Sequence, residues 1–265
     1  MEENAKGGRE AQGQNGCNHQ RPGDCRLPMN RDPRVTSADD VTQPKPKGNC
    51  VIDKGHKDGQ TTLNVCTYNT RTLKTDELQN FKWDIIGLCE TKREGEGVVE
   101  LQGGAWLYNQ GKTEDNKDAK GIGFLIHPKF KDFVKGMKCH SNRVISVTVQ
   151  LTGNKQLRIV QVYAPTSEYD DEAVEEVYEE IAKAIEESEA EYTIVMGDFN
   201  AKIGSYQPGE ESIMGKFGIG ERNDRGDMLL EFAAQQGLVI ANTYFKKNKN
   251  RYWTWESPGG SLKPN

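Results

Sequence analysis

The stretch TIVMGDFNAKIG, residues 193–204, decides how the rest of the chain is interpreted. Its first four residues are strand-like, and a glycine, an acid, an aromatic residue and an amide follow where a buried strand would simply turn. An ionised carboxylate at the end of an apolar run carries a large desolvation cost unless it is paired. Asp198 is therefore held by hydrogen-bond donors, bound to a cation, or exposed at the end of a sheet.

The length of 265 residues and the composition, 34% hydrophobic and 28% charged, suit one large domain or two small ones. No apolar run approaches the roughly 20 residues of a membrane span, and the first residues lack the apolar stretch of a secretory signal. We therefore expect an intracellular protein that does not enter a membrane. The six cysteines form no CxxC pair, which favours reduced thiols.

The formal net charge of −5 is unevenly distributed, because residues 168–191 hold twelve acidic residues and one lysine. Near the C-terminus, FKKNKNRYWTW (245–255) interleaves basic and aromatic side chains. This composition is typical of a surface that contacts a nucleic-acid backbone and stacks on bases. A solvated hairpin would have the same composition.

The first 60 residues are rich in Gly, Pro, Asn, Asp and Gln, and we predict a disordered tail there. Two segments with helical spacing, residues 174–188 and 224–237, predict helices, and Gly237 suits the end of the second; a shorter helix is expected at residues 75–81. Seven short runs rich in Val, Ile and aromatic residues predict strands: LNVCTY (63–68), DIIGLC (84–89), GIGFLIH (121–127), RVISVTVQL (143–151), LRIVQVY (157–163), YTIVM (192–196) and LVIAN (238–242). This pattern predicts an α/β fold with two packed mixed sheets covered by helices.

Four of these predicted strands end in polar residues, namely Asn69, Glu90, Tyr163, and Asp198 with Asn200. In layered folds, ligands collect at strand ends, so we expect these side chains to converge. A Glu and an Asp brought together repel each other unless a cation neutralises them. Oxygen ligands without His or Cys favour Mg²⁺ or Mn²⁺ over zinc.

Each of these residues also has an ordinary structural explanation. Asn69 suits a turn or a helix N-cap, and Glu90 could pair with a neighbouring cation. Tyr163 could belong to the core, and Asp198 could cap a following helix. One shared site explains all four positions together.

Five motifs in order resemble those of the endonuclease/exonuclease/phosphatase superfamily: CTYNTRTL (66–73), DIIGLCETKR (84–93), VQVYAPT (160–166), VMGDFNAKIG (195–204) and YWTWESPGG (252–260). Members of this superfamily share the DNase I-like four-layered α/β sandwich. The sequence is most similar to the apurinic-type endonuclease domain of RTE-clade non-LTR retrotransposons and to craniofacial development protein 2-like proteins. The resemblance implies that residues 61–265 form this domain.

The resemblance also implies a metal-dependent phosphodiester hydrolase that nicks DNA. Glu90 would be the metal ligand, with Asn69 beside it, and the cofactor would be Mg²⁺ or Mn²⁺. Tyr163 would contact the phosphate. Asp198 would position or deprotonate the attacking water, with Asn200 as its hydrogen-bonding neighbour.

DNA is the partner that the resemblance implies, which suggests a nuclear location; no obligate protein partner is expected. Thr254 matches a threonine at the DNA-facing edge of the family. Lys247, Arg251 and Trp253 of the basic cluster are the further predicted nucleic-acid contacts. Thr166 departs from the pattern, because some relatives have Asn there.

Two elements of the family pattern have no counterpart in this sequence, a strand Asp after the TWES-like motif and a terminal Asp-His pair. All four histidines precede Asp198. We therefore expect a domain that is incomplete at its C-terminus, with its last strands missing, and an impaired hydrolase. The alternative is a non-catalytic, retrotransposon-derived remnant that binds nucleic acid.

Overall fold

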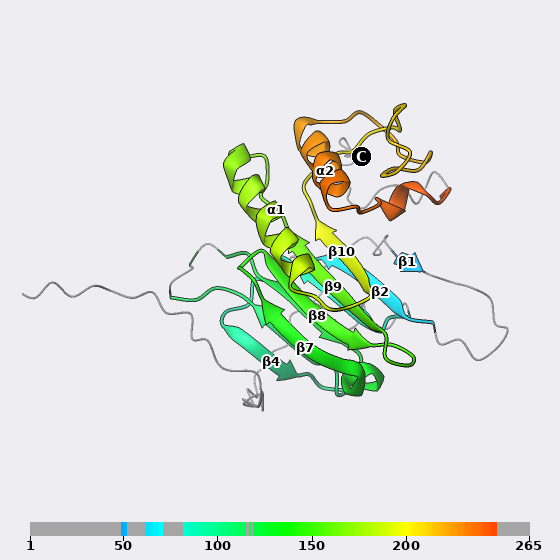
Figure 1. Cartoon of the computed structure of the whole chain (residues 1–265). Coiled ribbons are helices and arrows are strands. Elements are labelled where there is room, and N and C mark those ends of the chain that lie inside the picture. The colour runs from blue at the N-terminus through cyan, green and yellow to red at the C-terminus, as the bar shows by residue number, and fades with distance from the viewer. Residues whose placement is uncertain (1–48, 52–61, 71–81, 115–116, 118, 248–265) are drawn as a thin grey trace, which may run out of the picture.

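The structure, a computed structural model, describes residues 49–51, 62–70, 82–114, 117 and 119–247 (Figure 1). Its helices are α1 (Asp171–Glu186) and α2 (Asp224–Gln235), with short 3₁₀ turns η2 (Pro128–Phe133) and η3 (Ala241–Thr243). Its strands are β1 (Asn49–Val51), β2 (Asn64–Asn69), β3 (Ile85–Cys89), β4 (Glu96–Glu100), β5 (Trp106–Gln110), β6 (Ile122–Ile126), β7 (Val134–Cys139), β8 (Val144–Gln150), β9 (Gln156–Tyr163) and β10 (Tyr192–Asp198).

These strands form two mixed sheets. The first has the order β1-β2-β3-β6-β5-β4, and the second has the order β10-β9-β8-β7. Each sheet contains one parallel pair, β2 with β3 and β9 with β10, while the other neighbours are antiparallel. A parallel pair brings two carboxyl ends to the same edge, so each sheet contributes two strand ends to a site.

The largest core cluster lies between the two sheets. Ile85, Phe124 and Ile126 of the first sheet pack with Ile145 and Ile159 of the second, and all five are fully buried. Side chains alternate across a strand, so the opposite faces of the same strands build two further clusters. This burial is the main force that holds the sheets face to face.

The outer face of the second sheet is covered by α1 and α2, which lie on the same side of the molecule in Figure 1. Val177 and Ile181 of α1 pack on Val160 and Val162 of β9. Asp170 caps α1, because its Oδ1 accepts a hydrogen bond from the backbone N of the third residue along at 3.0 Å. The apolar stripe of α1 thus faces the sheet, and its numerous carboxylates face solvent.

Most of the predicted elements are present. Six of the seven predicted strands and both longer helices are confirmed. The seventh prediction, LVIAN, is wrong: after α2, Gly237 adopts a φ of +63°, and Ile240 forms only an isolated bridge to Met214 before η3 begins. No neighbouring strand pairs with this run among the described residues, and Val239 is exposed, so its apolar composition does not lead to a sheet.

The predicted fold class is confirmed as an α/β fold with two packed mixed sheets. The described residues contain few helices. β1 lies inside the predicted N-terminal tail and pairs with β2. The expected helix at residues 75–81 lies outside the described residues, and the domain boundaries stay a prediction. Within the described part of the chain, no helix combines the length and apolar character needed to cross a bilayer.

Gly197, which precedes Asp198 in β10, lies where the backbones of β10 and β9 approach each other closely. Its φ is +145°, and a Cβ there would lie 1.9 Å from the backbone oxygen of Val162 on β9. We expect Gly197→Ala to lower the free energy of unfolding by about 2 to 4 kcal/mol in urea titrations, because the two strands must move apart. Gly136→Ala is the control, since a Cβ at Gly136 meets no atom within 4 Å. Equal unfolding midpoints for the two variants would contradict the close approach.

Candidate functional site

The candidate site lies where the two parallel pairs end. Asn69 is the last residue of β2, and Glu90 follows β3 in the first sheet. Tyr163 ends β9 and Asp198 ends β10 in the second sheet. Because β10 contacts both β2 and β3 across the core, the four ends meet at one edge of the molecule.

The amide group of Asn69 joins the two carboxylates. Its Nδ2 donates hydrogen bonds to Glu90 Oε1 at 3.0 Å and to Asp198 Oδ2 at 2.8 Å. Only the NH₂ end of an amide can face two carboxylate oxygens, so this orientation follows from chemistry. Among the described residues, no Lys or Arg lies within 4.0 Å of either carboxylate. A neutral amide, and no Lys or Arg side chain among the described residues, thus joins the two carboxylates.

Tyr163 forms the wall of the site. Its ring is buried, and its hydroxyl donates to Glu90 Oε1 at 3.4 Å. Burial raises the pKa of the Tyr163 phenol, and the nearby charges of Glu90 and Asp198 raise it further. The phenol therefore keeps its proton at neutral pH and remains a hydrogen-bond donor.

Asn200 braces Asp198 from the loop that follows β10. Its backbone N donates to Asp198 Oδ1 at 3.1 Å, and its Nδ2 donates to the backbone oxygen of Ala164 at 2.8 Å. The backbone N of Ala164 in turn donates to the backbone oxygen of Asp198 at 2.8 Å. Asp198 is therefore fixed by its own loop and by the residue after β9.

Backbone strain is concentrated at the site. Among the described residues, Glu90, Lys92 and Asn200 are the non-glycine residues with positive φ, at +56°, +51° and +49°. This left-handed conformation costs roughly 1 to 2 kcal/mol for an L-residue, less for Asn than for Glu. Strain that the surrounding structure maintains is typical of functional sites.

A buried polar layer lies directly beneath the site. The Gln161 side chain, two residues before Tyr163, donates from Nε2 to Thr67 Oγ1 and to Cys89 Sγ, both at 3.1 Å. Gly87 on β3 leaves room for it, since a Cβ there would lie 1.8 Å from Gln161 Oε1. Burial raises the pKa of the Cys89 thiol to about 12, so this thiol stays protonated. The layer links β2 and β3 to β9 just below the residues that form the site.

The donors present match the hard cation predicted from the sequence. Glu90, Asp198 and Asn69 offer carboxylate and amide oxygens, which suit Mg²⁺ or Mn²⁺. Within the described ranges, no group of three or more His, Cys, Asp or Glu side chains gathers as a metal site. A metal would therefore depend on the two carboxylates, assisted by Asn69 and by water.

The structure thus brings together Asn69, Glu90, Tyr163, Asp198 and Asn200, whose individual roles stay predictions. Of the predicted nucleic-acid contacts, Lys247 lies within the described residues, after η3, and makes no hydrogen bond or ion pair with the described site residues. The other three, Arg251, Trp253 and Thr254, lie outside the described residues. Sequence reasoning missed Arg143, which stacks on Tyr163; a cation directly before an apolar strand was the available signal.

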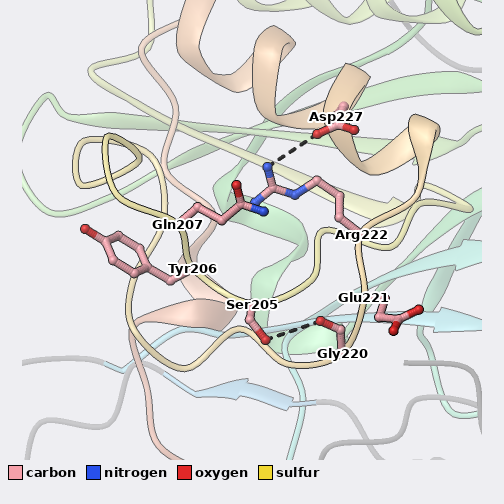
Figure 2. A pocket seen from close by; sticks show the side chains of 7 residues that line it. All are labelled: Ser205, Tyr206, Gln207, Gly220, Glu221, Arg222 and Asp227. Atoms are coloured by element: carbon pink, nitrogen blue, oxygen red, sulfur yellow. Dashed lines mark hydrogen bonds and ion pairs between the residues drawn. The ribbon is translucent and has the colours of Figure 1, made fainter.

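A separate open hollow of about 600 Å³ lies between the loop after β10 and the start of α2 (Figure 2). Its one arginine, Arg222, is already engaged: its guanidinium bonds both carboxylate oxygens of Glu210 at 2.6 and 2.9 Å and Asp227 at 3.3 Å. None of the strand-end residues lines it. We therefore place the candidate chemistry at the strand ends and not in this hollow.

Comparison with known proteins gives two results. Residues 157–258 match the family described as endonuclease-reverse transcriptase. The chain is also similar to craniofacial development protein 2 of Bos taurus (30% identity over 246 residues, 86% of this chain and 40% of the relative) and of Tragulus javanicus (30% over 209 residues, 75% and 35%). The resemblance found in the sequence is confirmed at this level. The chain spans about two fifths of the length of these curated relatives.

The shared amide predicts how the site responds to an added charge. Asn69→Asp places a third carboxylate beside Glu90 and Asp198, and these two neighbours raise the pKa of the introduced carboxyl in the folded state. Because that pKa exceeds its value in the unfolded chain, the substitution lowers the free energy of unfolding fully above the raised pKa. This loss disappears below about pH 4, where the carboxyl is protonated in both states. We expect a loss of about 1 to 3 kcal/mol at neutral pH in chelator, and a much smaller loss near pH 4.

Urea unfolding at the two pH values measures this difference. Asn154→Asp, in the exposed turn before β9, is the matched control and should have little effect at either pH. A loss at Asn69→Asp that does not change with pH would mean that the carboxylates are not in contact.

Proposed function

We propose that the strand-end site hydrolyses phosphodiester bonds of DNA with Mg²⁺ or Mn²⁺, because residues 157–258 match the family described as endonuclease-reverse transcriptase. The observation that supports this most is the pair of carboxylates, Glu90 and Asp198, held together by Asn69 with no Lys or Arg of the described part of the chain within 4.0 Å. Such a pair gains stability from a bound divalent cation. The whole reaction is a proposal, since the relatives are longer than this chain.

In this mechanism, Glu90 and Asn69 would hold the metal ion, which when bound offsets negative charge on the phosphoryl oxygens. Asp198, fixed by Asn200, orients the attacking water and accepts its proton. The water oxygen forms a bond to phosphorus while the bond from phosphorus to the leaving sugar oxygen breaks. The leaving oxygen takes a proton from solvent.

Tyr163 donates a hydrogen bond to a phosphoryl oxygen. Its raised pKa keeps the hydroxyl protonated, so it can stabilise negative charge that develops there. Its buried ring holds the hydroxyl beside Glu90, within 3.4 Å of the carboxylate. The hydroxyl has one proton, so a bound phosphoryl oxygen would take over the hydrogen bond that the hydroxyl donates to Glu90.

The same proposal extends to the rest of the domain. The two sheets are the inner layers of a DNase I-like four-layered sandwich, and α1 and α2 belong to one outer layer. We propose that Lys247 and the other basic and aromatic side chains of residues 245–255 contact DNA, and that the protein acts in the nucleus. These assignments rest on the motifs in the sequence and on the family match.

Hydrolysis of bis(4-nitrophenyl) phosphate tests the proposal, because nitrophenolate leaves without needing a proton from the enzyme. With protein in excess and Mn²⁺ or Mg²⁺ present, we expect metal-dependent release of nitrophenolate. Asp198→Asn and Glu90→Gln should each lower the rate at least about 100-fold. Asp132→Asn, an exposed aspartate in η2, is the matched control and should retain the rate.

A second assay uses supercoiled plasmid, in which nicks should require the same two carboxylates. If the chain binds plasmid but neither substrate is cleaved, the non-catalytic alternative is the better description. Cleavage that survives both Asp198→Asn and Glu90→Gln would place the chemistry elsewhere.

The acidic face of α1 gives a further prediction. Glu175 and Glu179 are exposed on this helix, which covers the outer face of the second sheet. The double substitution Glu175→Gln with Glu179→Gln removes two negative charges, so DNA affinity should stay the same or rise slightly. Fluorescence anisotropy at fixed salt measures this, with Lys247→Ala as the variant that should weaken binding. A clear loss of affinity in the glutamine variant would place α1 in the DNA-binding surface.

A further inference from the structure

Arg143 extends the row of strand-end residues by one strand. It directly precedes β8, which is antiparallel to β9, so the start of β8 lies beside the end of β9. The backbone N of Tyr163 donates to the backbone oxygen of Arg143 at 2.9 Å, and Arg143 Nη1 donates to the backbone oxygen of Tyr163 at 3.2 Å. Along the edge of the sheet, the order is Asp198, Tyr163, Arg143.

Two aromatic rings hold the guanidinium of Arg143. Its Cζ lies 5.7 Å from the ring centre of Tyr163 and 4.9 Å from that of Tyr169. Both distances are in the range of cation-π contacts. Tyr169 is 41% exposed, so it forms the outer side of this arrangement.

The segment that carries Tyr169 is itself anchored. Its backbone oxygen accepts a hydrogen bond from Arg225 Nη2 at 2.7 Å, and Arg225 forms an ion pair with Asp171 at 2.9 Å. These contacts tie the loop after β9 to α1 and α2. The aromatic wall beside Arg143 is therefore fixed before any ligand arrives.

The charge of Arg143 is not neutralised by a close acid. Among the described residues, no carboxylate lies within 4.0 Å of it, whereas Arg222 has two such partners and Arg225 has one. Burial raises the pKa of the Glu180 carboxyl, and the more distant charge of Arg143 offsets this only in small part; that carboxylate accepts its hydrogen bond from Ser141. A guanidinium has five N–H donors, and the described contacts of Arg143 use one of them.

We propose that Arg143 binds a second phosphate of the substrate strand, next to the phosphate that reaches Glu90 and Asp198. Adjacent strands lie about 4.8 Å apart, so the guanidinium sits one strand beyond Tyr163 along the same edge. A planar, weakly hydrated guanidinium with free N–H groups suits a phosphate. This inference rests on the proposed function and makes it more specific: the substrate is a polymer with consecutive phosphates, and a single phosphodiester leaves Arg143 empty.

Binding of a fluorescent thymidine hexanucleotide in chelator tests the proposal without any cleavage. We expect Arg143→Met to weaken binding about 10-fold or more, and to lower the slope of log affinity against log salt by about 0.7. Arg143→Lys should keep the slope of log affinity against log salt, because the positive charge remains. It should bind the hexanucleotide more weakly than the native chain, because the planar set of guanidinium N–H donors is lost. Tyr169→Ala keeps the cation and removes one ring, so a loss of about 3-fold to 10-fold is expected.

Lys135→Met is the matched control, since Lys135 is an exposed cation on β7, at the far edge of the second sheet. If Arg143→Met binds the hexanucleotide as Lys135→Met does, with the same salt slope, the proposal is wrong. Thermal unfolding of each variant shows whether the fold is kept, and Tyr169→Ala provides the test if Arg143→Met does not fold. An unchanged affinity in folded Tyr169→Ala and Arg143→Lys would then overturn the proposal.

The comparison with bis(4-nitrophenyl) phosphate separates this inference from the proposed function. That ester has one phosphate, so Arg143→Met should reduce cleavage of the oligonucleotide at least about 10-fold more than cleavage of the ester. Equal losses on both substrates would assign Arg143 to the reacting phosphate and overturn the second-phosphate subsite. If the native chain cleaves neither substrate, the proposed function fails, while the hexanucleotide titration still decides whether Arg143 binds phosphate.

Discussion

The alignment of the two sheets depends on one buried amide, that of Gln161. It is a fully buried polar side chain between the sheets, and it bonds Thr67 of β2 and Cys89 of β3. A buried polar group that loses its partners costs about 1 to 3 kcal/mol, so sliding one sheet over the other is penalised far more sharply than by apolar contacts alone. The residues one or two positions further along these strands form the candidate site, whose contacts therefore inherit this alignment.

The site itself is a costly arrangement. It holds two carboxylates close together, and it places Glu90 and Asn200 in the left-handed region of φ. Both features reduce stability, and the apolar core between the sheets offsets them. The destabilising features are confined to the site at one edge, whereas the fully buried aliphatic side chains lie between the sheets. The residues that stabilise the fold are therefore different from those that form the candidate site.

The sequence predicted those parts of the fold that are encoded locally. Polar residues after apolar runs indicated the site, and the spacing of Val177 and Ile181 indicated the face of α1. Four strands were missed in the sequence: β1, which has only three residues, and β4, β5 and β7, which carry charged or amide side chains within short segments. β4 and β7 lie at edges of the described sheets, where no described strand pairs with their outer side, and an edge does not require a continuous apolar run.

The residues that sequence reasoning missed depend on contacts between distant segments. Gln161 is a single amide residue within the strand-like run LRIVQVY, and its hydrogen-bond partners lie 72 and 94 residues away in the sequence. Arg143 acquires its position only when β8 pairs with β9. The run LVIAN shows the opposite error, because apolar composition without a neighbouring strand gives a turn.

The fit between Gly87 and Gln161 has a consequence for how this protein can change over evolution. Any side chain at position 87 would occupy the space of the Gln161 carboxamide, so the two positions share one fixed volume. A larger residue at 87 is compatible only with a smaller one at 161, and that exchange would also remove the bonds to β2 and β3. Related sequences should therefore vary at these two positions together, and a Gly-Gln pair in a distant relative would indicate the same spacing of the sheets even where the surface residues have diverged.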